Sequence, residues 1–592
     1  MTTFPQILQE RLAEALAKAG YSLPDGFVLQ VTQATDARFG DYQSNAAMML
    51  AKPLRSNPRA IAESAAEAFD TRDLCEKPTI AGPGFINFAL TPEALSARFP
   101  SLLGDERCGV AKTQAAQKIV IDFSAPNIAK PMHVGHIRST IIGDSLARIA
   151  RFLGHIVTTD NHIGDWGTQF GIIIHGWKTI LDPAQLEANP AAELLRVYKT
   201  ITAKVEEEKK ADNDETITFC RNDLVKLQAG DKENHAIWKQ CIALSLKSLE
   251  GVYEILDVSF DEYLGESFYN DALAPLVEEL TESGIAQESE GAICIFSDGS
   301  KAPENDPFKI KKKDEWLDIP AMVRKSDGGF NYATTDLATI DHRVREFEAS
   351  QVWYVVGAPQ QLHFQQVFEA ARRWGHTSTT FSHVAFGSIL GMDGKPFKSR
   401  SGDSVELLDV IDEAIDRARN VVEEKNPDLS DEEKATIAKA VGIGALKYAE
   451  LSQHRMTNYV FDWDGMLSLR GNTAPYLLNA YVRTRAIFRK LGADSIDFGN
   501  SFALTEPAER ALLLKVSQFA EIVPDILTDF RPNLLATYLF ETAKSFHSFF
   551  EACPVLRSEG ATRATRLALC ELTSRVLKLG LSLLGIQVTE RM

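Results

Sequence analysis

Two histidines spaced three residues apart, His133 and His136, are well placed for phosphate chemistry. They enclose Gly135 in the sequence HVGH, between the apolar run KIVIDF and the amphipathic stretch IRSTIIGDSLARIARFLGH. The unpaired N–H groups and positive dipole at a helix N-terminus bind anions, and a residue without a Cβ lets a flat ring approach the backbone. The pattern therefore indicates a nucleotide site whose imidazoles stabilise charge on a phosphorus under attack.

A four-residue motif is a weak signal, and two other interpretations of it stay open. A histidine at a helix start can cap the helix, and a pair of histidines can form half of a metal site. A metalloprotease-type site would need the glutamate of HExxH, which is absent here, as is a nearby cysteine. The seven cysteines include no CxxC pair, so the sequence predicts neither a disulfide framework nor a structural zinc site.

The segments around the motif predict a doubly wound parallel sheet. KIVIDF is a short apolar run typical of a buried parallel strand. The long amphipathic helix follows, then a second strand at 155–159 and the glycine-rich loop NHIGDWGTQFG. Strand, helix and strand joined by short loops form a right-handed βαβ unit. Further strands are expected in GGFNYATTDLATI, VWYVVGA and SHVAFGSIL.

The length of the chain and the changes in hydrophobic pattern and charge along it divide the 592 residues into three predicted domains. Residues 1–112 are expected to form a small α+β domain. Residues 113–430 hold the Rossmann-like sheet, interrupted at about 180–310 by a charge-rich and mostly helical insertion. From 431 to 592 apolar residues recur at helical spacing, which predicts an all-α bundle. The expected fold class is therefore multidomain α/β.

Composition excludes several classes of protein. Apolar residues make up 45% and charged residues 24%, which excludes a disordered chain. The sequence contains no apolar run long enough for a transmembrane helix, and its start lacks the pattern of a signal peptide. A cytoplasmic protein without membrane contact is expected. The net charge of −18 argues against indiscriminate binding of nucleic acid.

Several segments together resemble class I aminoacyl-tRNA synthetases, and arginyl-tRNA synthetases in particular. They are SAPNIAKPMHVGH, NHIGDWGTQFG, YVFDWDGMLSLRGNTAPYLLNAYVRTRAI and the ending LLGIQVTERM, so the resemblance spans nearly the whole chain. It implies an arginine–tRNA ligase that uses ATP and Mg²⁺ to form arginyl-adenylate and then charges the 3′ end of tRNA(Arg). It also implies a monomer without a structural metal, an N-terminal domain that touches the tRNA, and a helical anticodon-binding domain.

The resemblance assigns roles to individual residues. It places ATP on the HVGH motif and on Lys398, and it gives catalytic roles to both histidines, Lys130 and Lys398. The arginine contacts that it implies are Asp122, Ala125, Pro126, Asn127, His136, Tyr332, Asp336 and Gln360.

A carboxylate is the residue type that discriminates arginine from lysine. A guanidinium is planar and rigid, so a carboxylate meets it with two parallel hydrogen bonds, whereas an ammonium has no such fork. Asp336, supported by Tyr332 and Gln360, fits this demand. The other interpretation of Asp336 is an N-cap for a helix formed by LATIDHRV.

The second class I signature, usually KMSKS, is degenerate in this chain. The matching stretch is GKPFKSRSG at 394–402. Cations on a mobile loop would stabilise pyrophosphate as it leaves, but neither Lys398 nor Arg400 occupies the place of the signature's second lysine. Lys130, three residues before His133, stands where many members of the family carry a substituting lysine. The alternative is that 394–402 is a solvated turn.

Aromatic and basic side chains occur together in the predicted helical bundle. Tyr476, Tyr481, Arg483 and Arg485 open one expected helix, and Phe546, Phe549 and Phe550 open another. Splayed anticodon bases stack on such rings while cations meet the phosphates, and core packing is the other role open to each ring.

Three other classes are weighed against this interpretation. A class I synthetase for cysteine would need zinc-ligand cysteines, which the spacing does not provide. A small-molecule nucleotidyltransferase would not need the helical tail. A non-catalytic paralogue of the synthetase would be expected to carry damage in HVGH or in the arginine pocket, and neither is visible.

Overall fold

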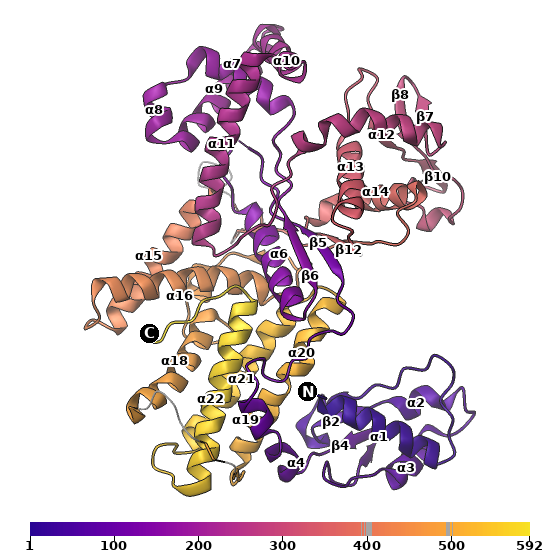
Figure 1. The fold of residues 1–592 in the computed structure, drawn as a ribbon, viewed down its shortest axis with the longest axis vertical. Helices are drawn as coiled ribbons and strands as arrows, with labels where there is room; N and C mark the ends of the chain where they lie inside the picture. The colour runs from indigo at the N-terminus through magenta and orange to yellow at the C-terminus, as the bar shows by residue number, and fades with distance from the viewer. Residues whose placement is uncertain (129, 392, 396, 398–404, 493–497, 500) are drawn as a thin grey trace.

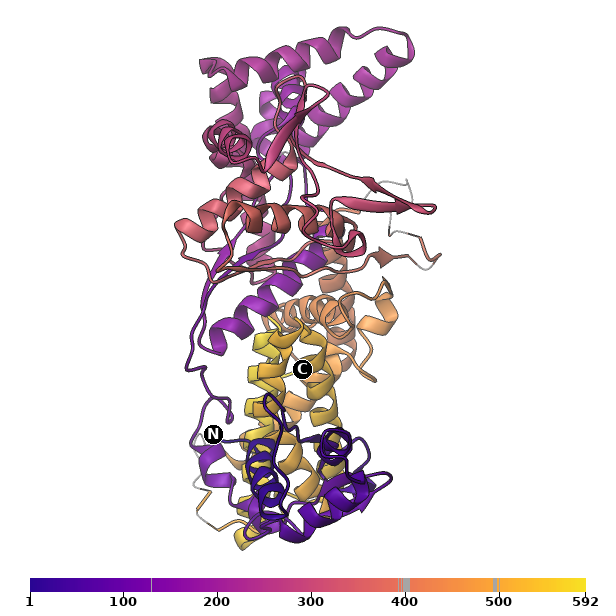
Figure 2. The same ribbon diagram turned by 90° about the vertical axis from the view of Figure 1, so that its right-hand side faces the viewer.

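The computed structural model describes the whole chain except residues 129, 392, 396, 398–404, 493–497 and 500. Figure 1 shows an elongated molecule with a parallel sheet near its middle. A helical insertion forms one end of the molecule, and the N-terminal unit lies at the other end beside the C-terminal helices, as the side view in Figure 2 also shows.

The central sheet has four parallel strands in the order β13-β12-β5-β6. These strands are β5 (Lys118–Asp122), β6 (Ile156–Asp160), β12 (Gln351–Tyr354) and β13 (Thr380–His383). Helix α6 (Gly135–Phe152) connects β5 to β6. Ile119, Val120 and Ile121 are at most 2% exposed, as expected for an apolar strand covered on both faces. The predicted parallel sheet and its βαβ unit are confirmed.

The insertion after β6 begins with a group of helices. These are α7 (Thr168–Ile180), α8 (Pro183–Ala188), α9 (Pro190–Lys210), α10 (Glu215–Gln228), α11 (Lys232–Ile255) and, further along, α12 (Asn270–Glu282). The predicted insertion at about 180–310 is thus mostly helical, as expected, and strands follow toward its end and beyond it. They are β7 (Ala286–Ser289), β8 (Ala292–Ile295), β9 (Lys309–Lys312), β10 (Glu315–Asp318) and β11 (Ala321–Arg324). Glu290 and Gly291, with φ of 52° and 79°, form the two-residue hairpin turn that joins β7 to β8.

The segment GGFNYATTDLATI is a helix and not the predicted strand. Helix α13 (Tyr332–Arg345) begins directly after its N-cap, Asn331. Ala333, Leu337 and Ile340 are buried at helical spacing, which explains why the helix forms. The other predicted strands are confirmed in β12, in β13 and in the short β14 (Ile389–Leu390), with helix α14 (Gln361–Trp374) between β12 and β13.

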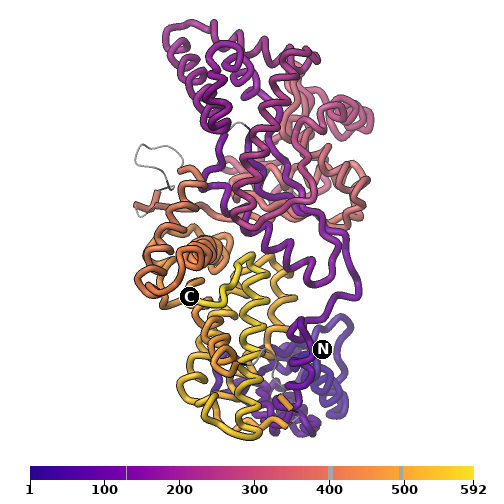
Figure 3. Tube along the Cα trace, turned by 60° about the vertical axis from the view of Figure 1, so that its left-hand side comes forward, coloured from indigo at the N-terminus to yellow at the C-terminus, as the bar shows by residue number. Residues whose placement is uncertain are grey.

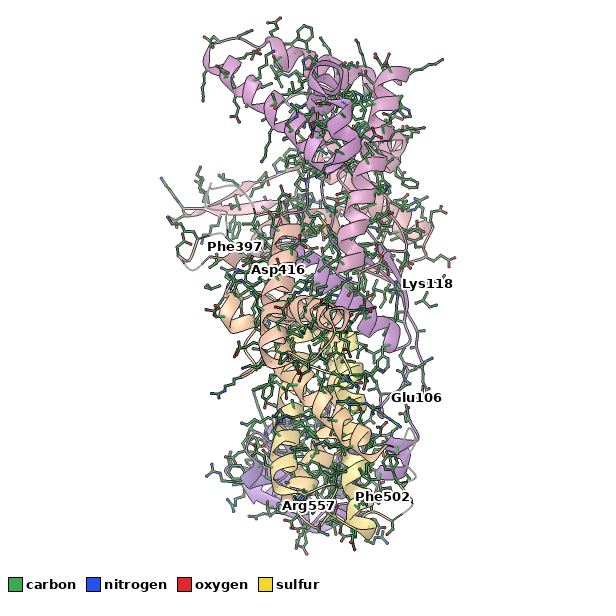
Figure 4. The ribbon with its side chains drawn as sticks, turned by 90° about the vertical axis from the view of Figure 1, so that its left-hand side faces the viewer. Glu106, Lys118, Phe397, Asp416, Phe502 and Arg557 are labelled. Carbon is green, nitrogen blue, oxygen red and sulfur yellow. The ribbon has the colours of Figure 1, made fainter. Side chains whose placement is uncertain are left out.

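The N-terminal unit is a four-stranded antiparallel sheet in the order β1-β2-β4-β3, covered by helices. Its elements are α1 (Phe4–Lys18), β1 (Thr32–Gln33), β2 (Tyr42–Ser44), α2 (Ala46–Ala51), α3 (Pro58–Ala68), β3 (Thr79–Ala81) and β4 (Phe85–Phe88), followed by α4 (Pro92–Ser96) and α5 (Phe99–Leu103). The connection to the central sheet passes Glu106 and reaches β5 at Lys118, as the labels in Figure 4 and the tube in Figure 3 show.

The last third of the chain is helical, as predicted. Its helices are α15 (Leu407–Lys425), α16 (Asp431–Leu451), α17 (Trp463–Met466), α18 (Ala474–Leu491), α19 (Pro507–Ser517), α20 (Phe519–Asp525), α21 (Pro532–Ala552) and α22 (Gly560–Leu583). The strand β15 (Tyr459–Val460) pairs with β14. Arg510 on α19 holds Asp41 of the N-terminal unit at 2.6 Å, so the first and last parts of the chain are joined.

Two further sequence-based expectations concern membranes and thiols. Among the helices formed by the described residues, none has the length and apolar character needed to span a bilayer. All seven cysteines are buried and free.

Candidate active site

The carboxyl ends of the sheet strands place several polar residues in a row. Tyr354 pairs with Asp122 and Asp122 with Asp160, so the three adjacent strands end at one edge. The loops that carry HVGH and NHIGDWG both leave this edge. Ligands of open α/β sheets bind in the crevice outside the carboxyl ends of the strands, and the site is therefore built upward from here.

The loop after β5 has a strained backbone. Ser124 and Ala125 have φ of 74° and 45°, a region that non-glycine residues rarely adopt. The Ser124 N–H donates to Ser139 Oγ at 2.8 Å, and the Ala125 N–H donates to Asn161 Oδ1 at 3.1 Å. Such strain persists where the surroundings fix it and is concentrated at functional sites. Helix α6 and the end of β6 thus fix this loop.

A buried hydroxyl from the insertion completes the support of this loop. The Tyr253 hydroxyl, on α11, lies 2.7 Å from the Ser124 hydroxyl and accepts a bond from Asn161 Nδ2 at 3.0 Å. The Thr140 hydroxyl donates to Ser124 Oγ at 2.9 Å. The helical insertion is therefore bonded directly to the strained loop.

Asn127 lies against the glycine-rich loop that follows β6. The Gly164 N–H donates to the Pro126 carbonyl at 3.1 Å, and the Ile128 N–H donates to the Gly164 carbonyl at 3.0 Å. A Cβ at Gly164 would overlap Asn127 Oδ1, so the glycine is what allows the asparagine to lie there. Asn127 and Ala125 are exposed at the edge, whereas Pro126 is buried.

His133 and His136 lie together at the start of α6. Their ring centroids are 3.9 Å apart. The His133 N–H donates to His136 Nδ1 at 3.1 Å, and the Gly135 N–H donates to His133 Nδ1 at 3.1 Å. Because both Nδ1 atoms accept, each neutral ring carries its proton on Nε2.

The electrostatics of the two rings agree with this tautomer. Burial, followed by the proximity of His133, lowers the pKa of His136 to about 4. Burial and then Lys130 lower the pKa of His133. The site thus presents two neutral N–H donors near the N-terminus of a helix, an arrangement suited to phosphate oxygens.

Lys130 has a described partner on the insertion. Its Nζ lies 4.3 Å from the centroid of the Tyr198 ring on α9, a cation–π contact. The same ammonium contributes to the lowered pKa of His133, so it lies between the insertion and the motif.

The segment after the second signature is tied to the first signature. The Val134 N–H donates to the Val405 carbonyl at 2.9 Å, and the Leu407 N–H donates to the Met132 carbonyl at 2.8 Å. On the other side of the gap, the Phe397 ring (labelled in Figure 4) stacks on another ring, that of Phe461, with centroids 4.7 Å apart. The predicted loop residues Lys398 and Arg400 lie outside the described residues.

Asp122 is engaged by an arginine of the chain itself. Arg343 Nη2 donates to Asp122 Oδ2 at 2.8 Å and to Asp160 Oδ2 at 2.6 Å, and the Arg343 side chain has no exposed surface. The carboxylate predicted to contact a ligand therefore has a structural partner beneath the site.

Asp336 lies in the second turn of α13, so its interpretation as an N-cap is wrong. Its Oδ2 bonds to His363 Nε2 on α14, and the two side chains are 19% and 26% exposed. Tyr332, at the start of α13, is 73% exposed, and Gln360, just before α14, is also exposed. The polar residues predicted for a cation pocket thus lie at or near the starts of two helices, α13 and α14.

A second carboxylate near Asp336 was missed by the sequence reasoning. Burial is the main cause that raises the pKa of Glu266 to about 7; the charge of His162 opposes this shift, and the charges of Asp165 and Asp336 add to it. Asp165 accepts two bonds from Ser267, at 2.8 and 2.6 Å, which hold this segment against the NHIGDWG loop. The available signal was the glycine of GESFY, because a Cβ at this position would lie 2.5 Å from Asp165.

The rings predicted to form a surface on the C-terminal helices divide between the core and the exterior. Tyr481, Phe546 and Phe549 are at most 2% exposed, so core packing is confirmed for them. The phenylalanines lie near the end of α21 and do not open a helix as predicted. Phe550 is 40% exposed and Tyr476 is half-buried, which leaves these two rings for an external contact.

The comparisons with known proteins cover the whole chain. Residues 98–463 match the family described as tRNA synthetases class I (R), catalytic domain. Residues 477–592 match the DALR anticodon binding domain, and residues 6–90 match the arginyl tRNA synthetase N terminal domain.

Individual relatives agree along their full lengths. An arginine–tRNA ligase of Synechococcus elongatus is 46% identical over 571 residues, which is 94% of each chain. One of Chromobacterium violaceum is 43% identical and is covered completely, as is this chain. A solved arginyl-tRNA synthetase from Plasmodium falciparum superposes with a TM-score of 0.81 at 28% identity, over 100% of both chains.

Proposed function

Because this chain belongs to the arginyl-tRNA synthetases of class I, we propose how its own residues divide the work of that reaction. The chain is an arginine–tRNA ligase. In its first step the carboxylate of L-arginine attacks the α-phosphorus of ATP, giving arginyl-adenylate and pyrophosphate. In the second step the 3′-terminal hydroxyl of tRNA(Arg) attacks the carbonyl carbon of the adenylate, and AMP leaves.

The observation that carries the assignment of residues is the fixed carboxylate of Asp336, whose charge acts on the carboxyl of Glu266. Two carboxylates whose charges repel each other favour a cation, and Asp336 is held in place by His363. A guanidinium offers two parallel N–H bonds to one carboxylate and still has donors for the other. Lysine would leave part of this set unpaired, which is how a polar site rejects a substrate that lacks the matching groups.

The exposed residues near this pair have supporting roles. Tyr332 and Gln360 flank the guanidinium. Asn127, next to Ala125 and Pro126 on the strained loop, binds the amino acid end of the substrate. Asp122 takes part through its charge, which Arg343 fixes at the end of β5.

The neutral imidazoles of His133 and His136 donate from Nε2 to the α-phosphate as negative charge builds on its oxygens. Gly135 leaves the helix start open to the nucleotide, and the dipole of α6 adds to the stabilisation. ATP is taken as its Mg²⁺ complex, and the metal is held chiefly by the phosphates of this substrate. Lys130 and Lys398 supply the cations that stabilise pyrophosphate as it departs.

Each of the three predicted domains has its own part in binding or charging the same tRNA. Residues 1–112 contact the body of the tRNA, 113–430 carry the chemistry, and 431–592 bind the anticodon. The bond between Arg510 and Asp41, which joins the first domain to the last, supports a single rigid tRNA-binding face. The enzyme acts as a monomer.

Aminoacylation of bulk tRNA with each amino acid in turn, in the presence of ATP and Mg²⁺, tests this function. Only arginine should be esterified, and the product should be confined to tRNA(Arg). Charging with lysine or glutamine and not with arginine would overturn the proposal.

A further inference from the structure

Arg138 is a buried cation in the first turn of α6, two residues after His136 of the HVGH motif. Its side chain is 1% exposed. An arginine is almost never buried so completely unless it is paired and its donors are satisfied. The groups that satisfy the Arg138 guanidinium therefore indicate which segments of the chain this residue holds together.

Three backbone carbonyls accept hydrogen bonds from the Arg138 guanidinium. Nη1 donates to the carbonyl of Gly387 at 2.8 Å and to that of Thr457 at 3.0 Å, and Nη2 donates to the carbonyl of Arg455 at 3.1 Å. Gly387 lies two residues before β14, and Thr457 lies two residues before β15, the strand that pairs with β14 in parallel. One guanidinium thus binds the starts of both strands to the start of α6.

The charge of Arg138 is balanced by Glu450 on α16. Arg138 Nε and Glu450 Oε2 are 3.0 Å apart, and the Glu450 side chain is also 1% exposed. The other oxygen of this carboxylate accepts a hydrogen bond from the hydroxyl of Tyr459, in β15. The rigid fork of a guanidinium meets carbonyls and a carboxylate at the same time. A lysine ammonium, with three donors and no plane, could not meet the same four groups.

The two strands pack closely where Arg138 binds them. A Cβ at Gly387 would lie 2.6 Å from Asn458 Oδ1 and 2.8 Å from the carbonyl oxygen of Met456. The Gly387 N–H donates to the Arg455 carbonyl at 2.9 Å. Because the two segments are in direct backbone contact, a shift of either one at Arg138 must carry the other with it.

Strand β14 leads into the second signature. The N–H of Phe397, which is labelled in Figure 4, donates to the Ile389 carbonyl at 3.1 Å, so the start of the signature segment is bonded to β14. Beyond the signature, the Val405 carbonyl accepts from the Val134 N–H at 2.9 Å. The residues described on either side of the signature are thus both anchored to the start of α6, one side through the HVGH backbone and the other through Arg138.

We propose that Arg138 is a positioning residue for the first step of the reaction, because it fixes β14, and with it the segment leading into the second signature, relative to HVGH. The proposal rests on the function proposed above, in which HVGH meets the α-phosphate and the signature segment meets pyrophosphate. These groups lie on opposite sides of the phosphorus–oxygen bond that breaks as the arginine carboxylate attacks. Transfer of arginine to tRNA involves no pyrophosphate and should not depend on Arg138.

Two changes at Arg138 test this role without leaving a single buried charge. Arg138→Lys keeps a positive charge opposite Glu450 but loses the planar fork. Arg138→Met combined with Glu450→Gln removes both charges together, since removal of one partner alone is strongly destabilising. Arg373→Lys is the matched control. Arg373 is also a buried arginine that bonds to a carbonyl, that of Phe296, and to a carboxylate, that of Glu369, and neither partner belongs to α6, β14 or β15.

The measurement compares the two steps of the reaction in each full-length variant. Adenylate formation is followed as single-turnover release of pyrophosphate, with tRNA(Arg) whose 3′-terminal ribose has been oxidised so that transfer cannot follow. Transfer is followed with intact tRNA(Arg) and synthetic arginyl-adenylate. Both Arg138 variants should form adenylate about tenfold to hundredfold more slowly, since a displacement of about 1 Å can lower a rate about 10²-fold. Their transfer rate and arginine KM should match those of the unaltered chain, and Arg373→Lys should leave the ratio of the two rates unchanged.

Other outcomes, in variants that thermal unfolding shows to be folded, would overturn the proposal. If both steps slow by the same factor, Arg138 supports the domain as a whole and does not position the second signature. If adenylate formation keeps its rate in either Arg138 variant, the position of β14 does not limit the first step. If the arginine KM rises instead, Arg138 acts on arginine binding. Failure of the unaltered chain to form arginyl-adenylate would contradict the function proposed above, and this is measured separately.

Discussion

His363 Nε2 on α14 bonds to Asp336 Oδ2 on α13, so one oxygen of the carboxylate proposed to bind the guanidinium is fixed by a neighbouring helix. A carboxylate held in one orientation meets a planar guanidinium with less loss of side-chain freedom than a mobile one. This relationship explains why a residue in a helix interior, and not at a helix cap, can serve in recognition.

Asp336→Asn should raise the KM for arginine by more than about tenfold and leave the KM for ATP nearly unchanged. The amide keeps the shape but removes the charge that faces the guanidinium, and loss of one partner of a buried charged pair typically costs about 2–5 kcal/mol. Asp341→Asn, on the same helix but paired with Arg345, is the matched control and should have little effect. Steady-state arginylation gives all of these constants, and an unchanged arginine KM in Asp336→Asn would place this residue outside the pocket.

Arginine binding should weaken as the pH falls below about 7. Burial raises the pKa of Glu266 to about 7 in the free enzyme, so below this pH the carboxyl is mostly protonated. A bound guanidinium favours the ionised form, and the proton must leave when arginine binds. The KM for arginine should therefore rise toward acid, by at most about tenfold per pH unit, since one proton is linked to binding.

Glu266→Gln tests whether the proton linked to arginine binding is carried by Glu266. The variant should bind arginine more weakly at pH 8, and its arginine KM should no longer vary between pH 6 and pH 8 in the way that the unaltered enzyme's does. A pH profile that survives the substitution would show that Glu266 does not carry this proton.

The sheet and helix α6 could be predicted because their signals are local. The run 118–122 is apolar and short, and HVGH follows it directly. The site proposed for the guanidinium could be assembled only in part from the sequence, because the residues assigned to it come together through the tertiary fold. Glu266 lies in the insertion, 70 residues before Asp336, and no local pattern links the two.

Residues 332–336 show where the sequence-based prediction was wrong: a strand was predicted, and the segment begins helix α13. Tyr332 and two adjacent threonines favour a strand by propensity, but Asn331 caps a helix here and three apolar residues at helical spacing bury its inner face. The burial of these apolar side chains outweighed the strand propensity of the individual residues. The partner of Asp122 is equally invisible in the sequence, because Arg343 follows it after 221 residues.

Gly164→Ala should impair arginine activation. The added Cβ would overlap Asn127 Oδ1, so either the asparagine or the loop around Gly164 must move. A displacement of about 1 Å in a positioned group can lower the rate about 10²-fold. Gly251→Ala is the control, because a Cβ there meets nothing within 4 Å and α11 should gain up to about 1 kcal/mol of stability.

Single-turnover formation of arginyl-adenylate, together with thermal unfolding of both glycine variants, checks this prediction. Gly164→Ala should be slow and remain folded. Normal adenylate formation in a folded Gly164→Ala variant would show that the position of Asn127 does not matter to activation.

Lys130→Ala should lower kcat for activation on the order of 10²–10³-fold, as is typical for the loss of one preorganised donor to a developing charge, and should leave the arginine KM nearly unchanged. That pattern marks an interaction made mainly in the transition state.

The position of Lys130 is the reason to expect this effect. Lys130 lies in the loop that leads to α6 and is close enough to His133 to lower its pKa, while the ring of Tyr198 holds its ammonium on the side of the insertion. Lys398→Ala should be less damaging, because Lys398 does not match the second lysine of the usual signature.

Single-turnover adenylate formation in both variants, with tRNA present, shows which substitution slows activation more. If Lys398→Ala is slower than Lys130→Ala by about tenfold or more, then residues 394–402 act as a conventional second signature and Lys130 belongs to the contact with Tyr198 alone.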